Sequence, residues 1–95
     1  MISKLQEKSP TVLIVDDNSH NVKIIALALQ PLNFKLVIAT NGKTAIEMVD
    51  KTRPDLVLLD VMMPGMDGYE TCTIIKSKKE NSNLPVIFLT ALTDK

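Results

Sequence analysis

The chain has 95 residues, the size of one small domain, and 45% of them are hydrophobic, which argues against disorder. Eleven Lys and Arg residues balance eleven Asp and Glu residues, so no overall charge attracts nucleic acid or an anionic membrane. Cys72 is the single cysteine, no apolar run approaches the roughly 20 residues of a membrane span, and no hydrophobic segment follows the N-terminal lysines. We therefore expect a cytoplasmic protein.

Four short apolar runs predict four strands. They cover residues 12–15, 36–39, 56–59 and 86–89. Each run is nearly continuous, which is typical of a strand that other elements cover on both faces. Pro85 precedes the fourth run, where a missing N–H group is tolerated.

Segments with helical periodicity lie between these runs. The first covers residues 19–30 and closes at Pro31, the second follows the Asn41-Gly42 turn, and the third follows Gly68. Their apolar stripes are Val22, Ile25, Ala26 and Leu29; Ala45, Ile46 and Val49; and Tyr69, Cys72 and Ile75. The alternation of strands and helices predicts an α/β fold with a parallel sheet, in which residues 1–10 form a tail and residues 11–95 form the domain.

Polar side chains follow three of the predicted strands. Asp16 and Asp17 follow the first, Asp60 the third, and Thr90-Ala91 the fourth. In parallel sheets ligands bind beyond the carboxyl ends of the strands, so we expect these residues to converge. Three clustered carboxylates repel one another, which raises at least one pKa unless a cation is present. Because Mg²⁺ prefers a few oxygen ligands, the pattern predicts a magnesium site.

Each of these residues also has a plainer explanation. Asp16 or Asp17 could cap the first helix, which is a common role for aspartate. Asp60 could be a turn residue, and Thr90 could be a β-branched residue that ends a strand. The joint placement of the residues at strand ends favours the metal site.

Three segments together identify a family resemblance. They are the acidic pair in VLIVDDN, the segment LLDVMMPGMDG, and Thr90-Ala91 after PVIFL. In order and spacing they resemble the receiver domain of two-component response regulators, from Thr11 to the end of the chain. The resemblance implies a flavodoxin-like (CheY-like) three-layer α/β/α sandwich.

The resemblance also implies a function. Asp60 would accept a phosphoryl group from a sensor histidine kinase or a histidine phosphotransfer protein. Thr90 would hydrogen-bond that group, and the small Ala91 would leave room for it. The domain would assist its own phosphorylation and dephosphorylation without being an enzyme in the usual sense, and would bind neither nucleic acid nor membrane directly.

The same resemblance implies how the metal is held. Asp17 and Asp60 would bind Mg²⁺ (or Mn²⁺) directly, together with the backbone carbonyl of Met62. Asp16 would hold the ion through a water molecule. These roles agree with the general requirement of phosphoryl transfer for positioning and charge neutralisation.

One part of the family pattern is missing. Receivers have a lysine at the end of a fifth strand, and Lys95 comes too soon after the fourth run to be that residue. The sequence therefore resembles a receiver that is truncated at its C-terminus and lacks the last strand and helices. The alternative is a receiver that no longer signals and serves as an assembly or interaction module.

The helix over residues 19–30 suggests self-association. Besides its apolar stripe it carries Ile24, Leu27 and Ala28 on the other side, and a helix that is apolar all round is expected to be buried all round. The edge of the fourth strand would also be open. We therefore expect a homo-oligomer, most simply a two-fold dimer.

Two other protein classes share parts of this pattern. A flavodoxin-type FMN carrier needs hydroxyl and N–H groups after the first strand, where Asp16-Asp17 would repel a phosphate. A haloacid-dehalogenase-like phosphatase needs a second aspartate two residues after the first, where Met62 stands. The chain also lacks the glycine-rich motifs of nucleotide-binding enzymes.

Overall fold

The computed structural model describes residues 9–89, so most of the expected tail lies outside the described residues. Within this part of the chain, four strands form one parallel sheet in the order β2-β1-β3-β4. The strands are β1 (Thr11–Val15), β2 (Lys35–Ala39), β3 (Leu56–Asp60) and β4 (Val86–Leu89). The four predicted strands and their parallel arrangement are confirmed.

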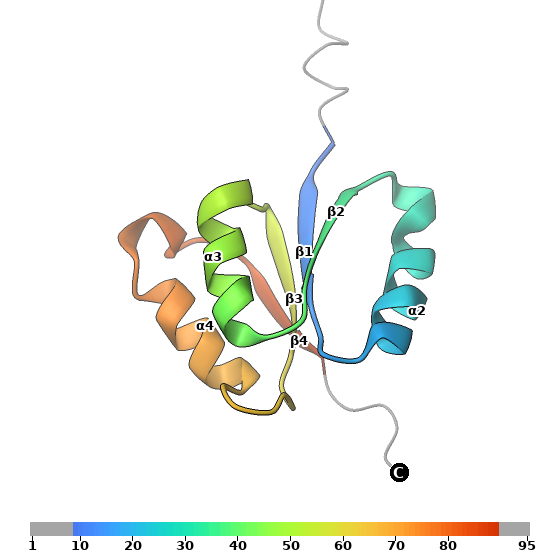
Figure 1. Ribbon diagram of the computed structural model, residues 1–95. Coiled ribbons are helices and arrows are strands. Elements are labelled where there is room, and N and C mark those ends of the chain that lie inside the picture. The colour runs from blue at the N-terminus through green and yellow to red at the C-terminus, as the bar shows by residue number, and fades with distance from the viewer. Residues whose placement is uncertain (1–8, 90–95) are drawn as a thin grey trace, which may run out of the picture.

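Helices cover both faces of this sheet. They are α2 (Ser19–Leu29), α3 (Gly42–Thr52) and α4 (Gly68–Lys76), with short 3₁₀ helices η1 (Gln30–Leu32) and η2 (Lys79–Asn81). Helix α2 lies on one face, and α3 and α4 lie together on the other (Figure 1). This confirms the flavodoxin-like three-layer fold. Among residues 9–89 no helix has the length and apolar character that crossing a membrane requires.

Each of the three α-helices in the described part of the chain begins at a side chain that accepts a hydrogen bond from its first turn. Asn18, Asn41 and Asp67 are these N-caps. Their side chains satisfy N–H groups that have no partner within the helix. Since Asn18 caps α2, neither Asp16 nor Asp17 has the capping role that was the alternative for them.

The side chains of β1 alternate between two apolar clusters. Leu13 and Val15 are fully buried under α3 and α4, and Val12 and Ile14 are buried on the α2 side. Strand β3 alternates in the same way, because successive side chains of a strand point to opposite faces. Side chains therefore pack on both faces of the two central strands, β1 and β3, and these strands lead directly into the candidate site residues.

The edge strands differ from the prediction that all four strands are covered on both faces. Ile38 of β2 is 47% exposed, and Ile87 of β4 is 52% exposed. Among the described residues, each of these strands has a neighbour on one side only, and α2 alone covers one face of the sheet. Continuous apolar runs do not distinguish a central strand from such an edge strand.

Two predictions about helix faces need correction. In α4 two residues of the predicted stripe are confirmed, because Ile75 is buried in the core and Cys72 packs against it, whereas Tyr69 is 58% exposed. The buried residues of the helix are Gly68, Thr71 and Ile75. The buried set begins one residue earlier than the predicted stripe, and the Tyr69 ring packs at the surface instead, 5.0 Å from the ring of Phe88.

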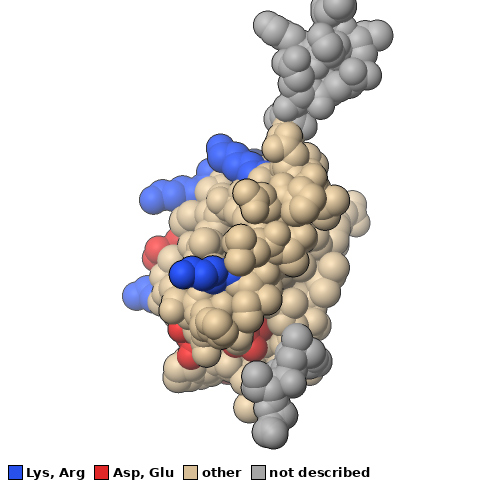
Figure 2. Space-filling model, turned by 90° about the vertical axis from the view of Figure 1, so that its right-hand side faces the viewer, with Lys and Arg blue, Asp and Glu red and all other residues tan. Residues whose placement is uncertain are grey.

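In α2 the predicted stripe does face the sheet, with Val22 buried in the cluster on that side. The other side of the helix is not buried within the described part of the chain. Ile24 is 53% exposed and Leu27 is 62% exposed. Figure 2 views this side of the molecule, and its Lys and Arg side chains gather toward the left of the face.

Candidate functional site

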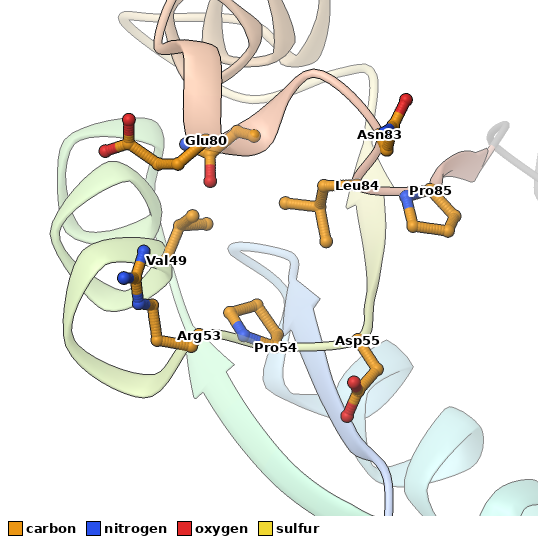
Figure 3. A pocket seen from close by; sticks show the side chains of 9 residues that line it. Val49, Arg53, Pro54, Asp55, Glu80, Asn83, Leu84 and Pro85 are labelled. Atoms are coloured by element: carbon orange, nitrogen blue, oxygen red, sulfur yellow. The ribbon is translucent and has the colours of Figure 1, made fainter.

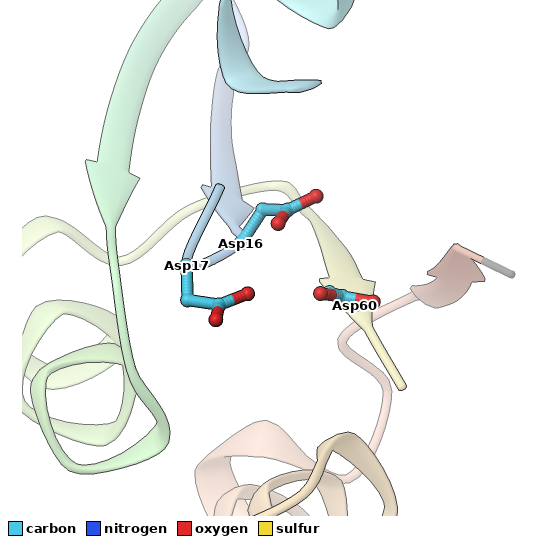
Figure 4. Close-up of side chains that lie close together, drawn as sticks. All are labelled: Asp16, Asp17 and Asp60. Carbon is cyan, nitrogen blue, oxygen red and sulfur yellow. The ribbon is translucent and has the colours of Figure 1, made fainter. Parts of the chain in front are cut away.

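The pairing of β1 with β3 brings the acidic residues together. Val15 pairs with Leu59, and the same offset carried one residue further sets Asp16 beside Asp60. Asp17 follows directly, and one carboxylate oxygen from each of the three aspartates lies within 4.8 Å of the others. Figure 4 shows the carboxylates of Asp17 and Asp60 pointing toward each other across the strand ends. The predicted convergence of these three residues is confirmed.

The three carboxylates differ in their exposure to water. Asp16 is 3% exposed and Asp60 is 9% exposed, whereas Asp17 is exposed. Two carboxylates of the cluster are therefore buried, and the third is open to water. A ligand can reach it from the carboxyl edge of the sheet.

Backbone N–H groups orient the two buried carboxylates. Oδ1 of Asp16 accepts a hydrogen bond of 2.9 Å from the N–H of Asn18, and Oδ1 of Asp60 accepts one of 3.1 Å from the N–H of Met62. Both bonds span two residues, which is the geometry of an Asx turn. One oxygen of each carboxylate is thereby fixed by the backbone that follows its strand.

The environment of Asp60 changes its acidity. The pKa of Asp60 is raised from 3.8 to about 6. Burial is the largest cause; the hydrogen bond from the Met62 N–H group lowers the pKa, and the neighbouring Asp16 and Asp17 carboxylates raise it. The repulsion expected among clustered carboxylates is therefore present, although burial is the larger cause. A cation bound here would favour the ionised form of Asp60.

The donor set fits a hard divalent cation. All three side chains offer carboxylate oxygens, the ligands that Mg²⁺ and Mn²⁺ prefer, and no nitrogen or sulfur ligand belongs to this cluster. The acidic pocket expected from the sequence is thus present among the described residues.

The loop between β3 and α4 forms one rim of the site. Met63 is 7% exposed and packs in the core, whereas Met62 is 69% exposed. Gly65 has a φ of 80°, a conformation that glycine adopts without steric cost. A cavity of about 600 Å³ opens along this loop. Its lining residues are Val61, Met62, Met63, Pro64, Gly65, Asp67 and Tyr69.

Thr90 and Ala91 lie outside the described residues. Leu89, the last residue of β4, pairs with Asp60 across the sheet. Thr90 is thus the residue that follows the strand partner of Asp60.

Two residues near the carboxylates belong to the quoted segments VLIVDDN and LLDVMMPGMDG, but the sequence alone predicts no role for either. Asn18 caps α2 and donates its N–H to Asp16, and Gly68 donates its N–H to the carbonyl of Val61 over 3.0 Å. The position of Asn18 between the acidic pair and a helical segment could have indicated its role. A glycine as the first residue of a helix gives no such signal, because the contact it permits is tertiary.

A second cavity lies at the opposite edge of the sheet, before β3 and β4 (Figure 3). It measures about 480 Å³. Its lining residues are Val49, Arg53, Pro54, Asp55, Glu80, Asn81, Asn83, Leu84 and Pro85. None of these residues belongs to the carboxylate cluster, so the two sites are separate.

Comparison with known proteins identifies the family. A family model described as "Response regulator receiver domain" matches residues 12–95. Response regulator PleD of Caulobacter vibrioides is 39% identical over 84 residues, which cover 88% of this chain and 18% of PleD. The chain thus spans less than a fifth of the length of this curated relative.

Solved structures agree with this match. The N-terminal domain of a response regulator receiver protein from Methanoculleus marisnigri is 36% identical, with a TM-score of 0.84 over 93% of this chain and 72% of that domain. Chemotaxis protein CheY4 of Vibrio cholerae is 28% identical, with a TM-score of 0.83 over 92% of this chain and 72% of its own. With the family model matching most of its length, the chain belongs to the receiver domains of two-component response regulators.

Proposed function

We propose that Asp60 is the phosphoacceptor through which this receiver domain takes part in two-component signalling. The observation that carries the proposal is the position of its carboxylate. Asp60 ends β3 between β1 and β4, where it lies beside the Asp16-Asp17 pair and pairs with Leu89, the last described residue of β4. Of the three clustered carboxylates, it is the one on the strand between β1 and β4.

In the proposed reaction a carboxylate oxygen of Asp60 attacks the phosphorus atom of the donor. A new P–O bond forms, the bond between phosphorus and its leaving group breaks, and an acyl phosphate remains on Asp60. The hydrogen bond from the Met62 N–H group holds one carboxylate oxygen and so limits rotation of the nucleophile. The chain thereby assists its own phosphorylation by positioning the acceptor.

The acidic residues would hold the cation that this reaction requires. Asp17 and Asp60 would bind Mg²⁺ or Mn²⁺ directly with the carbonyl of Met62, and the more deeply buried Asp16 would act through water. Such a cation supplies neutralisation of the negative charge that gathers on the phosphoryl group. The all-oxygen donor set supports this assignment.

The proposal extends to the residues after β4 and to the donor. Thr90 would donate a hydrogen bond to the phosphoryl group, and Ala91 would leave space for it. Membership of the receiver family supports a sensor histidine kinase or a histidine phosphotransfer protein as the donor. A cytoplasmic location is consistent with such a partner.

Acetyl phosphate with Mg²⁺ tests the assignment of Asp60. We expect intact-protein mass spectrometry to show one added phosphoryl group that hydroxylamine removes, and Asp60→Asn to abolish it. Asp55→Asn is the matched control, because Asp55 is an exposed carboxylate at the opposite edge of the sheet. A hydroxylamine-labile label that persists in Asp60→Asn would place the acceptor elsewhere.

We also propose that this chain associates with a second copy of itself. Ile24 and Leu27 on α2 and Ile87 on β4 are large apolar side chains that are more than half exposed. On the face seen in Figure 2, the Lys and Arg side chains of the described residues lie toward the left. Antiparallel pairing of two β4 strands about a two-fold axis would cover Ile87 and the strand edge together.

A further inference from the structure

The first residue of α4 lies unusually close to the backbone that carries Asp60. Gly68 is buried, and its N–H donates a hydrogen bond of 3.0 Å to the carbonyl of Val61. On the other side, the N–H of Val61 donates to the carbonyl of Leu89 over 3.3 Å. The backbone just after Asp60 is thus held between α4 and β4.

The space at Gly68 does not admit a side chain. An ideal Cβ on this residue would lie 2.3 Å from the carbonyl oxygen of Asp60 and 2.9 Å from the Cα atom of Val61. Among the described glycines Gly65, not Gly68, has a positive φ, so conformational freedom does not explain a glycine here. The atoms that exclude a methyl group are backbone atoms, which cannot move aside by a change of rotamer.

Helix α3 provides a comparison. It also begins with a buried glycine, and an ideal Cβ on Gly42 would lie 2.4 Å from Oγ1 of Thr71 and 2.9 Å from Sδ of Met66. These are side-chain atoms, one on α4 and one in the loop before it, and a side chain can move aside by a change of rotamer. Crowding at Gly42 therefore tests how α3 packs on α4 and on this loop, whereas crowding at Gly68 tests the backbone at the end of β3.

We propose that Gly68 is a positioning residue for the phosphoacceptor, an inference that rests on the proposed role of Asp60. A methyl group at position 68 must separate α4 from the end of β3 by about an ångström to restore ordinary contact distances. That separation moves the Asp60 carbonyl and the Met62 N–H group, which orients the Asp60 carboxylate. Displacements of this size at reacting groups can lower rates by about a hundredfold.

The experiment compares Gly68→Ala with Gly42→Ala. We expect Gly68→Ala to slow phosphorylation by saturating acetyl phosphate by roughly tenfold or more and to weaken Mn²⁺ binding several-fold, as read by electron paramagnetic resonance of free Mn²⁺. It should also shift the Met62 amide resonance in ¹H–¹⁵N spectra. Gly42→Ala should lower the unfolding midpoint but leave the rate, the Mn²⁺ affinity and the Met62 resonance near their original values.

The outcomes separate this inference from the assignment of Asp60. If the unaltered chain takes no label, the role of Asp60 fails, while Mn²⁺ affinity and the Met62 resonance still compare the two glycines. If Gly68→Ala does not fold, the measurements are repeated on the double variant Gly68→Ala with Arg53→Gly. The second substitution is expected to stabilise the fold, because Arg53 ends α3 in the left-handed conformation, which glycine adopts at lower cost. Folding lost again, or equal effects of both glycine variants, would show that Gly68 serves the fold alone and would overturn the proposal.

Discussion

At Asp60 two physical effects act against each other. Burial favours the protonated carboxyl group, while a role as nucleophile requires the carboxylate. The hydrogen bond from the Met62 N–H group favours the carboxylate, but it does not offset the burial and the charges of Asp16 and Asp17. The ionised form of Asp60 is therefore disfavoured unless a bound cation offsets the negative charge of the site.

This balance predicts how stability depends on pH. The folded state binds a proton at Asp60 more tightly than the unfolded state, because the pKa of Asp60 is raised from 3.8 to about 6. Without divalent cations, the stability that a protonated Asp60 contributes to the folded state is therefore lost as the pH rises between these two values. We expect Asp60→Asn to be more stable than the unaltered chain at about pH 7 by roughly 1 kcal/mol, less than the full shift implies because the site opens to water.

Urea unfolding of both chains from about pH 4 to pH 8 measures this difference. The difference should shrink toward the acid end of the range, and Mg²⁺ should reduce it at neutral pH. A difference that is independent of pH would contradict the raised pKa of Asp60.

Asp17 gives a separate prediction about the cation. Its exposed carboxylate faces Asp60, so replacing it with an amide takes one negative charge from the site and leaves a weaker, neutral oxygen ligand. We expect Asp17→Asn to weaken Mg²⁺ and Mn²⁺ binding by about tenfold or more, as measured by titration calorimetry. Glu47→Gln removes an exposed carboxylate from α3 outside the cluster and should change the affinity little. Equal affinity in Asp17→Asn and the unaltered chain would rule out the assignment.

At the scale of elements, the start of α4 fixes the end of the rim loop. Asp67 accepts a hydrogen bond of 2.8 Å from the N–H of Glu70, and the Glu70 carboxylate accepts one of 3.1 Å from the N–H of Asp67. This reciprocal pair is a capping box, and it fixes the first turn of α4, which begins with Gly68. The same helix end therefore closes the loop that begins at Asp60.

Loss of this cap should cost stability. We expect Asp67→Ala to lower the free energy of unfolding by about 1 kcal/mol, because the N–H of Glu70 loses its acceptor and the reciprocal pair is broken. Glu80→Ala, at an exposed residue of η2, is the control and should change the free energy of unfolding by less than about half as much. Chemical unfolding measures both variants, and an unchanged value for Asp67→Ala would mean that packing alone defines the start of α4.

At the scale of the whole molecule, the two faces of the sheet are covered unequally. Two helices pack over the cluster around Leu13 and Leu59, while α2 alone packs over the cluster around Ile14. Large apolar side chains on α2 and β4, namely Ile24, Leu27 and Ile87, remain more than half exposed. Another chain that packed on them would remove this apolar area from water.

This asymmetry leads to a prediction about oligomeric state. We expect light scattering to find a dimer at micromolar concentration, and Ile87→Lys to shift it toward the monomer because a charge would be buried at the edge of β4. Ile38→Lys on the opposite edge strand β2 is the matched control and should leave the dimer intact. A stable, folded monomer of the unaltered chain would rule out self-association.

The strands, the α-helices, the parallel sheet and the carboxylate cluster could all be predicted from the order of the residues. Apolar runs, helical periodicity and the Asn41-Gly42 turn mark the elements because they depend on local backbone preference and on which side chains avoid water. Asp16, Asp17 and Asp60 could be placed together because parallel strands end at one edge of the sheet.

The tertiary structure alone decided how these elements fit together. Continuous apolar runs could not show that Ile38 and Ile87 lie on edge strands, because burial depends on neighbours distant in the sequence. The raised pKa of Asp60 depends on how deeply the strand end is buried, and the close approach of Gly68 depends on where α4 packs. Distances between segments that are far apart in the chain set these properties, and no local pattern of residues encodes them.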